Sequence, residues 1–216
     1  MKAENLRSHT LWIYGVVVAL AVREAVTRVV PHALSPPFEG FSALWPEALR
    51  LTVFLIIIVR FYLGAAEFFE KYAEGARDRE AYVFDFFIGL LHFLIFFALA
   101  VTVSSHPTAA TPQPSPQHWF LVTLCVILLY DWFWWVFTML LGWKLPAPVP
   151  EWIAINTITF VFVLAGYFVS SVRLQPVTSE TIAMVPVLFF SVLDLVDMSR
   201  DGTLIADFAK RVFARR

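Results

Sequence analysis

The chain has 216 residues, of which 59% are hydrophobic and only 15% are charged, and its mean hydropathy is +0.72. A water-soluble domain of this size cannot keep such a composition in solution, so the composition excludes a soluble domain and predicts a protein embedded in lipid. The formal net charge is −1, and the basic residues gather near the two termini and in one loop. This distribution indicates membrane topology and gives no sign of a nucleic-acid surface.

Six mainly apolar stretches are long enough to cross a bilayer, which takes roughly 20 residues of helix. They cover residues 11–30, 49–68, 83–103, 119–141, 152–172 and 181–198. We therefore expect an all-α integral membrane protein, with one bundle of six transmembrane helices over residues 1–198 and no second domain.

The first stretch is one of the two weakest of the six because it contains Arg23, Glu24 and Arg28. It can also be read as a signal peptide with a basic start and a cleavage site at residues 19–21. The charged residues directly after its apolar core favour a membrane span instead.

The connecting segments alternate between basic and non-basic. Segments 31–48 and 104–118 contain no lysine or arginine, whereas segment 69–81 and the tail over 199–216 contain several and segment 142–151 contains Lys144. Basic segments stay on the cytoplasmic side, so the pattern places both termini in the cytoplasm, with Arg173 as the one exception. Short loops with this bias are typical of a multi-pass protein of the bacterial inner membrane.

The tail combines an apolar face with basic residues. Its apolar residues are Leu204, Ile205, Phe208, Val212 and Phe213, and four lysine or arginine residues lie elsewhere on the same helix. The tail is therefore expected to form a short amphipathic helix on anionic lipid head groups, or else a frayed basic terminus.

Six polar residues inside the apolar stretches or at their edges are candidates for a functional site. A charge at the bilayer centre costs at least about 2.5 kcal/mol, so each needs a partner, a cavity or water. Arg60, His92 and Asp131 lie near the middle of their stretches, Asn156 and Asp194 lie in the cytoplasmic half, and Asp85 lies near the inner boundary. We predict one polar pocket, formed by the arginine with Asp131 and Asp194 and supported by the other three.

Helical spacing predicts how these residues are surrounded. Gly64 lies one turn after Arg60, and Gly89 lies between Asp85 and His92 on one face. A glycine lets a neighbouring helix approach, so we expect these two glycines to leave room beside the charges.

The fourth stretch places a carboxylate among tryptophans. Asp131 shares its helical face with Trp134 and Trp135. A carboxylate with an aromatic wall at mid-membrane can hold a cation, since both attract it when water is excluded. Packing without any ligand is the alternative for the tryptophans, and equally for His92 and Asn156.

Charge counting suggests a function. Arg60 is the one fixed cation expected deep in the membrane, whereas Asp131 and Asp194 are two deep carboxylates. The unmatched carboxylate must be protonated, paired with protonated His92, or occupied by a cation. The leading hypothesis is therefore translocation or sensing of a proton or small cation. An ion pair that only holds helices together is the structural alternative.

Other functional classes have weaker support. The chain has no phosphate-binding loop, zinc motif or nucleophile motif, and its single cysteine, Cys125, lies in an apolar stretch. No metal or cofactor is predicted, and a non-enzyme is favoured. One alternative is a membrane subunit that assembles with cytoplasmic partners through segment 69–81 and the basic tail, whereas the leading hypothesis expects a bundle that forms homo-oligomers. A third is a lipid-modifying enzyme using Asp85, Asp194 and Asp197.

Overall fold

The computed structural model describes residues 3–34, 41–74, 79–104, 116–143, 148–171 and 176–199. These residues form six α-helices and the short turns at their ends. The helices are α1 (Ala3–Leu34), α2 (Phe41–Glu74), α3 (Arg79–Val101), α4 (Pro116–Leu140), α5 (Pro148–Ser171) and α6 (Pro176–Met198). The predicted all-α fold class is confirmed for this part of the chain, whereas most of the predicted amphipathic tail lies outside it.

Five of these helices are long and apolar enough to cross a membrane. The qualifying segments are Trp45–Phe69, Ala81–Val101, Trp119–Leu140, Glu151–Val169 and Thr178–Met198. They agree with five of the predicted stretches to within a few residues. The helix α1 is not among the five, and its charged residues, such as Glu24 and Arg28, lower its hydropathy.

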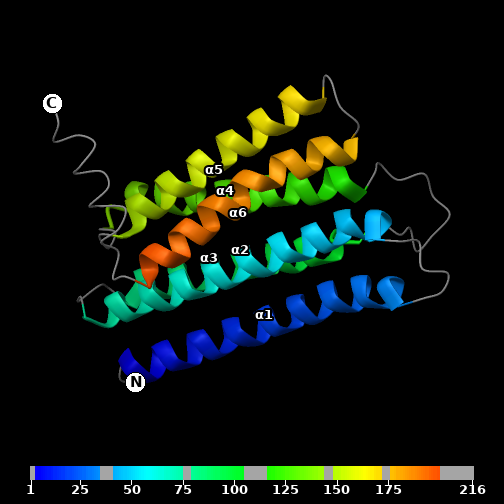
Figure 1. Cartoon of the computed structure of the whole chain (residues 1–216). Coiled ribbons are helices and arrows are strands. Elements are labelled where there is room, and N and C mark those ends of the chain that lie inside the picture. Colours follow the sequence, from blue (N-terminus) through cyan, green and yellow to red (C-terminus); the bar gives the residue numbers. More distant parts are fainter. Residues whose placement is uncertain are drawn as a thin grey trace, which may run out of the picture.

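The helices run alternately in opposite directions and lie side by side along their lengths (Figure 1). Contacts join α1 to α2 and α3, α3 to α4, α4 to α5, α5 to α6 and α6 back to α2, so the bundle closes on itself. Since α2 and α6 start at the same end, they are parallel neighbours. The start of α1 and the ends of α2, α4 and α6 share one end of the bundle.

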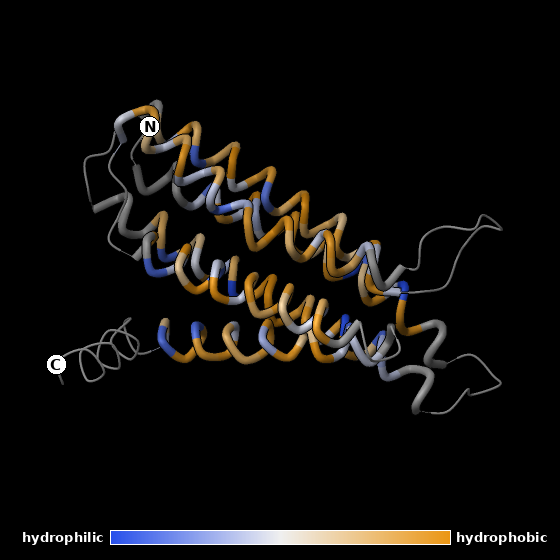
Figure 2. The backbone as a smooth tube through the Cα atoms, turned by 90° about the horizontal axis from the view of Figure 1, so that it is seen from above, coloured by the Kyte–Doolittle hydropathy of each residue, from blue (hydrophilic) through white to orange (hydrophobic). Residues whose placement is uncertain are grey.

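Apolar side chains cover the outside of the bundle. Large hydrophobic residues such as Phe133 and Leu140 are 66% and 76% exposed, whereas Arg50 and Arg60 are completely buried. Figure 2 shows apolar residues along most of every helix, interrupted by isolated hydrophilic ones. A soluble protein has the opposite distribution of charge, so the outer surface suits contact with lipid.

The helix α1 is tied to α3 by two hydrogen bonds near the end that holds the N-terminus. Thr10 Oγ1 and Tyr82 Oη are 2.6 Å apart, and Tyr14 Oη donates to the carbonyl of Phe86 at 2.8 Å. Further along the helix, Arg28 pairs with Glu24 of the same helix, with 2.6 Å between Nε and Oε1.

Candidate functional site

An ion pair links α2 and α6 in the interior. Arg60 donates from Nε to Asp194 Oδ2, and the exposed fractions of the two side chains are 0% and 6%. The guanidinium carbon also lies 5.2 Å from the centre of the Phe61 ring. The two terminal nitrogens of Arg60, Nη1 and Nη2, have no hydrogen-bond partner within the described residues. The structure thus brings together two of the three residues predicted to form the pocket.

A second polar group joins α3, α4 and α5. Asn156 Nδ2 donates to Asp131 Oδ2 at 2.6 Å, and His92 Nδ1 lies 3.5 Å from Asp131 Oδ1. The imidazole packs against aromatic rings, with 4.8 Å to the centre of Phe61 and 4.5 Å to that of Tyr130. Within the described chain, His92 Nε2 and Asn156 Oδ1 lack a hydrogen-bond partner. Three helices thus converge on Asp131.

Asp85 lies near the group formed by Asp131, Asn156 and His92 but has a different hydrogen-bond partner. It is on the same face of α3 as His92, two turns nearer the start of the helix. Trp134 Nε1 donates to Asp85 Oδ1 at 2.6 Å. The helices α3 and α4 run in opposite directions. Trp134, almost one turn after Asp131 on α4, and Asp85, two turns before His92 on α3, are therefore displaced toward the same end of the bundle.

The predicted tryptophan wall around Asp131 needs correction. Trp134 is buried near it but uses its indole N–H on Asp85. Trp135 instead packs edge-on against Trp132, with 5.1 Å between ring centres, and is not one of the residues around the cavity described next. Trp152 of α5 supplies the second indole.

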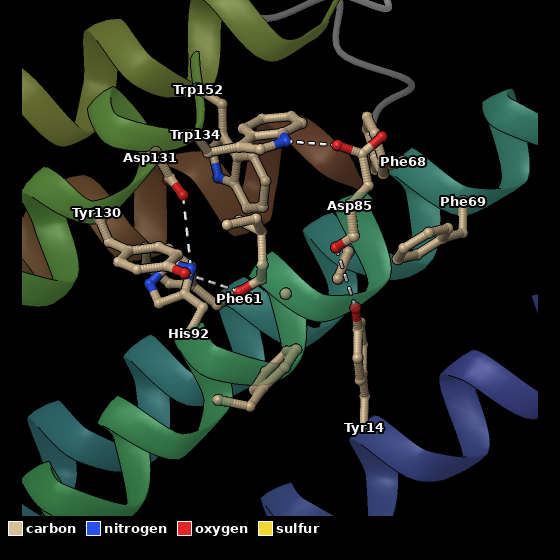
Figure 3. A pocket seen from close by; sticks show the side chains of 14 residues that line it. Tyr14, Phe61, Phe68, Phe69, Asp85, His92, Tyr130, Asp131, Trp134 and Trp152 are labelled. Atoms are coloured by element: carbon tan, nitrogen blue, oxygen red, sulfur yellow. Dashed lines mark hydrogen bonds and ion pairs between the residues drawn. The ribbon is translucent and has the colours of Figure 1, made fainter. Parts of the chain in front are cut away.

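A cavity of about 60 Å³ lies between α1, α2, α3, α4 and α5. Such a volume accommodates several water molecules or a small ligand, since one water needs roughly 10–15 Å³ measured in this way. Its lining comprises Tyr14, Phe61, Ala65, Phe68, Phe69, Asp85, Ile88, Gly89, His92, Phe93, Tyr130, Asp131, Trp134 and Trp152 (Figure 3). Asp131 and His92 therefore border a space that a water molecule or ligand can occupy.

The two glycines act differently from the expectation. A Cβ atom at Gly64 would overlap the indole of Trp152, and one at Gly89 would overlap the phenol of Tyr14. The space beside Arg60 and Asp85 is therefore filled by rings from α5 and α1. The glycines bring these two aromatic side chains into the cavity wall.

Arg60, the one fixed cation expected deep in the membrane, is joined in the interior by a second buried arginine. Arg50 of α2 is also completely buried and pairs with Glu180 of α6, with 2.7 Å between Nε and Oε1 and 3.2 Å between Nη2 and Oε2. Its Nη1 donates to the carbonyl of Val103 at 3.0 Å. The sequence analysis did not single out this pair, because Arg50 lies at the start of the second apolar stretch and Glu180 directly precedes the sixth.

These contacts change the charge balance of the interior. Each buried arginine contacts one carboxylate, Arg50 with Glu180 and Arg60 with Asp194. The partners of Asp131 are instead an amide and an imidazole. In the part of the chain that the structure describes, no arginine directly contacts Asp131, although Arg60 acts on it through space.

The carboxylates proposed for a lipid-modifying enzyme have separate surroundings. Asp85 accepts from Trp134, Asp194 is paired with Arg60, and Asp197 is buried on α6. No group of three or more His, Cys, Asp or Glu residues that could hold a metal ion occurs among the described residues. Protein-family models, curated proteins and solved structures were all compared with the chain, and none matches it.

Proposed function

We propose that this membrane protein translocates or senses a proton or a small cation at Asp131, with Arg60 as a fixed positive charge nearby. The observation that carries the proposal is the difference in partners: the buried arginines Arg50 and Arg60 pair with Glu180 and Asp194, whereas among the described residues Asp131 contacts a neutral amide and a histidine. A carboxylate in such surroundings exists as an acid, beside an imidazolium, or with a bound cation.

Buried hydrogen-bonding groups without a partner support the proposal, and two of them belong to the side chains that contact Asp131, His92 and Asn156. Within the described chain, Arg60 Nη1 and Nη2, His92 Nε2, Asn156 Oδ1 and Ser191 Oγ are buried without a partner. Buried polar groups of native proteins almost always have one, which is often an ordered water molecule. Water or an ion between these groups would give a proton or cation a polar path beside Asp131.

The arrangement of helix ends supports a cytoplasmic location of both termini. The start of α1 and the ends of α2, α4 and α6 share one end of the bundle, and most of the basic residues of the sequence lie near these helix ends along the chain. We propose that this end faces the cytoplasm of a bacterial inner membrane and that α1 is the sixth span. Binding of the tail to anionic lipids and assembly into homo-oligomers remain predictions.

The test is proton and alkali-cation flux into liposomes that contain the purified protein. We expect Asp131→Asn to reduce flux to the level of protein-free liposomes, because the amide keeps the shape but cannot carry the charge. Arg60→Gln should also reduce it. Glu24→Gln is the matched control, since it makes the same carboxyl-to-amide change at a partly exposed residue of α1.

Normal flux by the Asp131→Asn protein would rule out the proposal. In that case the buried charges only hold the helices together, and the membrane-subunit alternative, with partners bound by segment 69–81 or by the tail, would be favoured. Neither that role nor a lipid-modifying activity is favoured by a contact within the described residues.

A further inference from the structure

Aromatic rings make up most of the cavity wall. Its aromatic residues are Tyr14, Phe61, Phe68, Phe69, Phe93, Tyr130, Trp134 and Trp152, which come from all five surrounding helices. The described lining also contains two carboxylates, Asp85 and Asp131, and neither lysine nor arginine. The faces of aromatic rings carry partial negative charge, so rings and carboxylates together attract a cation.

Hydrogen bonding makes the wall still less suited to an anion. The hydroxyl of Tyr14 donates to the carbonyl of Phe86 at 2.8 Å, and that of Tyr130 donates to the carbonyl of Ile88 at 3.0 Å. The indole N–H of Trp134 donates to a carboxylate at 2.6 Å. These three side chains have no donor left for a ligand and offer only oxygen lone pairs and ring faces.

Two polar atoms of the lining remain open to a ligand or to water. Trp152 Nε1 and His92 Nε2 have no hydrogen-bond partner among the described residues, and His92 is only 8% exposed. Water molecules beside a bound cation can satisfy them. Buried polar atoms without a protein partner usually bind water or a ligand, so these two atoms favour an occupied cavity in the working protein.

The two carboxylates lie on opposite sides of the cavity. Figure 3 shows Asp131 beside His92 and Tyr130, with Asp85 on the other side. His92 and Asp85 are seven residues apart on α3, which is roughly 10 Å along a helix. A ligand between them therefore meets negative charge at both sides and aromatic rings around it.

The chemistry of the wall selects among cations. Hard cations such as Ca²⁺ and Mg²⁺ take about six or more oxygen ligands. Here one oxygen of Asp85 and one of Asp131 already accept hydrogen bonds, and most of the remaining wall is aromatic carbon. Rings instead bind weakly hydrated ammonium ions through cation–π interactions, which strengthen when water is excluded.

We infer that the cavity binds a small organic ammonium ion, such as a methylated amine, between Asp85 and Asp131. Its alkyl groups would contact the rings of Phe68, Trp134 and Trp152. This inference rests on the proposed function, because Asp131 belongs to both, and it names the class of cation that the site takes.

The test is calorimetric titration of the purified protein in lipid nanodiscs with tetramethylammonium chloride or with sodium chloride at matched ionic strength. We expect tetramethylammonium to bind at least about ten-fold more tightly than sodium. Asp85→Asn should weaken its binding by about ten-fold, because the amide still accepts from Trp134 but carries no charge.

Two further substitutions distinguish the contribution of the Trp152 ring from that of its indole N–H. Trp152→Leu should weaken tetramethylammonium binding by about ten-fold, whereas Trp152→Phe should retain most of it because a ring face remains. Trp132→Leu is the control, since Trp132 is 37% exposed, donates to Thr157 and does not line the cavity.

Equal affinity for the two salts, or tetramethylammonium binding that Asp85→Asn leaves unchanged, would overturn the inference. The flux and binding measurements distinguish failure of this inference from failure of the proposed function. Loss of flux in Asp131→Asn without tetramethylammonium binding would refute the ligand class and keep the translocation site. Tight tetramethylammonium binding together with normal flux in Asp131→Asn would refute the translocation site and keep the ligand site.

Discussion

Buried charges in this interior are of two kinds. Arg50 and Arg60 each contact a carboxylate of α6, so each pair is close to neutral where it is buried. Among the described residues, the partners of Asp131 are a neutral amide and an imidazole. A carboxylate paired with an arginine can hold two helices in register, whereas a carboxylate without a fixed cation in contact retains the freedom to exchange a proton or a cation.

The two ion pairs should differ in function but not in stability. Removing one partner leaves a buried charge and typically costs about 3–5 kcal/mol, whereas an apolar pair of similar size often restores stability. We expect Glu180→Gln and Asp194→Asn each to lower the free energy of unfolding in detergent by this order. The double variants R50M/E180L and R60M/D194L should recover most of the loss.

Flux then distinguishes the pairs. The R50M/E180L protein should retain flux because its pair only joins α2 and α6. The R60M/D194L protein should lose flux because Asp131 no longer has a fixed cation nearby. Equal flux in both double variants would show that Arg60 serves only to hold α2 against α6.

At this scale the sequence identified residues that are costly to bury. Arg60, Asp131 and Asp194 stood out because a charge in the middle of an apolar stretch needs an explanation. Glu180 was missed because it precedes the predicted sixth stretch by one residue. Tyr14 and Trp152 were missed because an aromatic residue in an apolar stretch looks the same whether it faces lipid, the core or a cavity.

At the scale of helices, glycines determine which rings reach the cavity. Gly64 lets Trp152 of α5 pack directly on α2, and Gly89 does the same for Tyr14 of α1 on α3. Sequence spacing placed both glycines beside the polar residues. It could not identify the rings that fill the space, because these come from helices 88 and 75 residues away (64 to 152 and 14 to 89).

Adding a methyl group at either glycine should therefore disturb helix packing. We expect Gly64→Ala to lower the free energy of unfolding by about 1–3 kcal/mol, because the indole must move from a packed position. Thermal unfolding in detergent would measure the effect. The same variant should also bind tetramethylammonium more weakly, since Trp152 lines the cavity.

Gly15→Ala provides the control for this change. A Cβ atom there would lie 3.6 Å from Tyr62 Oη, which is an ordinary contact. Alanine also favours a helix over glycine by up to about 1 kcal/mol, so this variant should be as stable as the wild type or more so. Equal loss of stability in both variants would mean that Trp152 does not require the glycine.

For the whole molecule, the apolar stretches predicted the six helices and, to within a few residues, the five segments long and apolar enough to cross a membrane, whereas α1 and α2 extend up to eight residues beyond the predicted bounds at each end. The stretches could not predict how the helices pack, because nothing in the spacing along one helix shows that α6 closes the bundle against α2. The first stretch is the exception among the six. Its charges leave α1 outside the set of clearly membrane-length apolar helices, although α1 packs on α2 and α3.

Cysteine labelling can determine the orientation and the path of α1 together. Cys125 is the only cysteine, so Cys125→Ser gives a cysteine-free background. New cysteines would replace the exposed residues Ser8 and Ser199 at one end of the bundle and Val30 and Thr178 at the other. In intact bacterial cells, a membrane-impermeant maleimide should label only the second pair, and permeabilised cells should show all four. Labelling of Ser199→Cys but not Thr178→Cys in intact cells would reverse the orientation, and Ser8 and Val30 positions reacting from the same side would exclude α1 as a span.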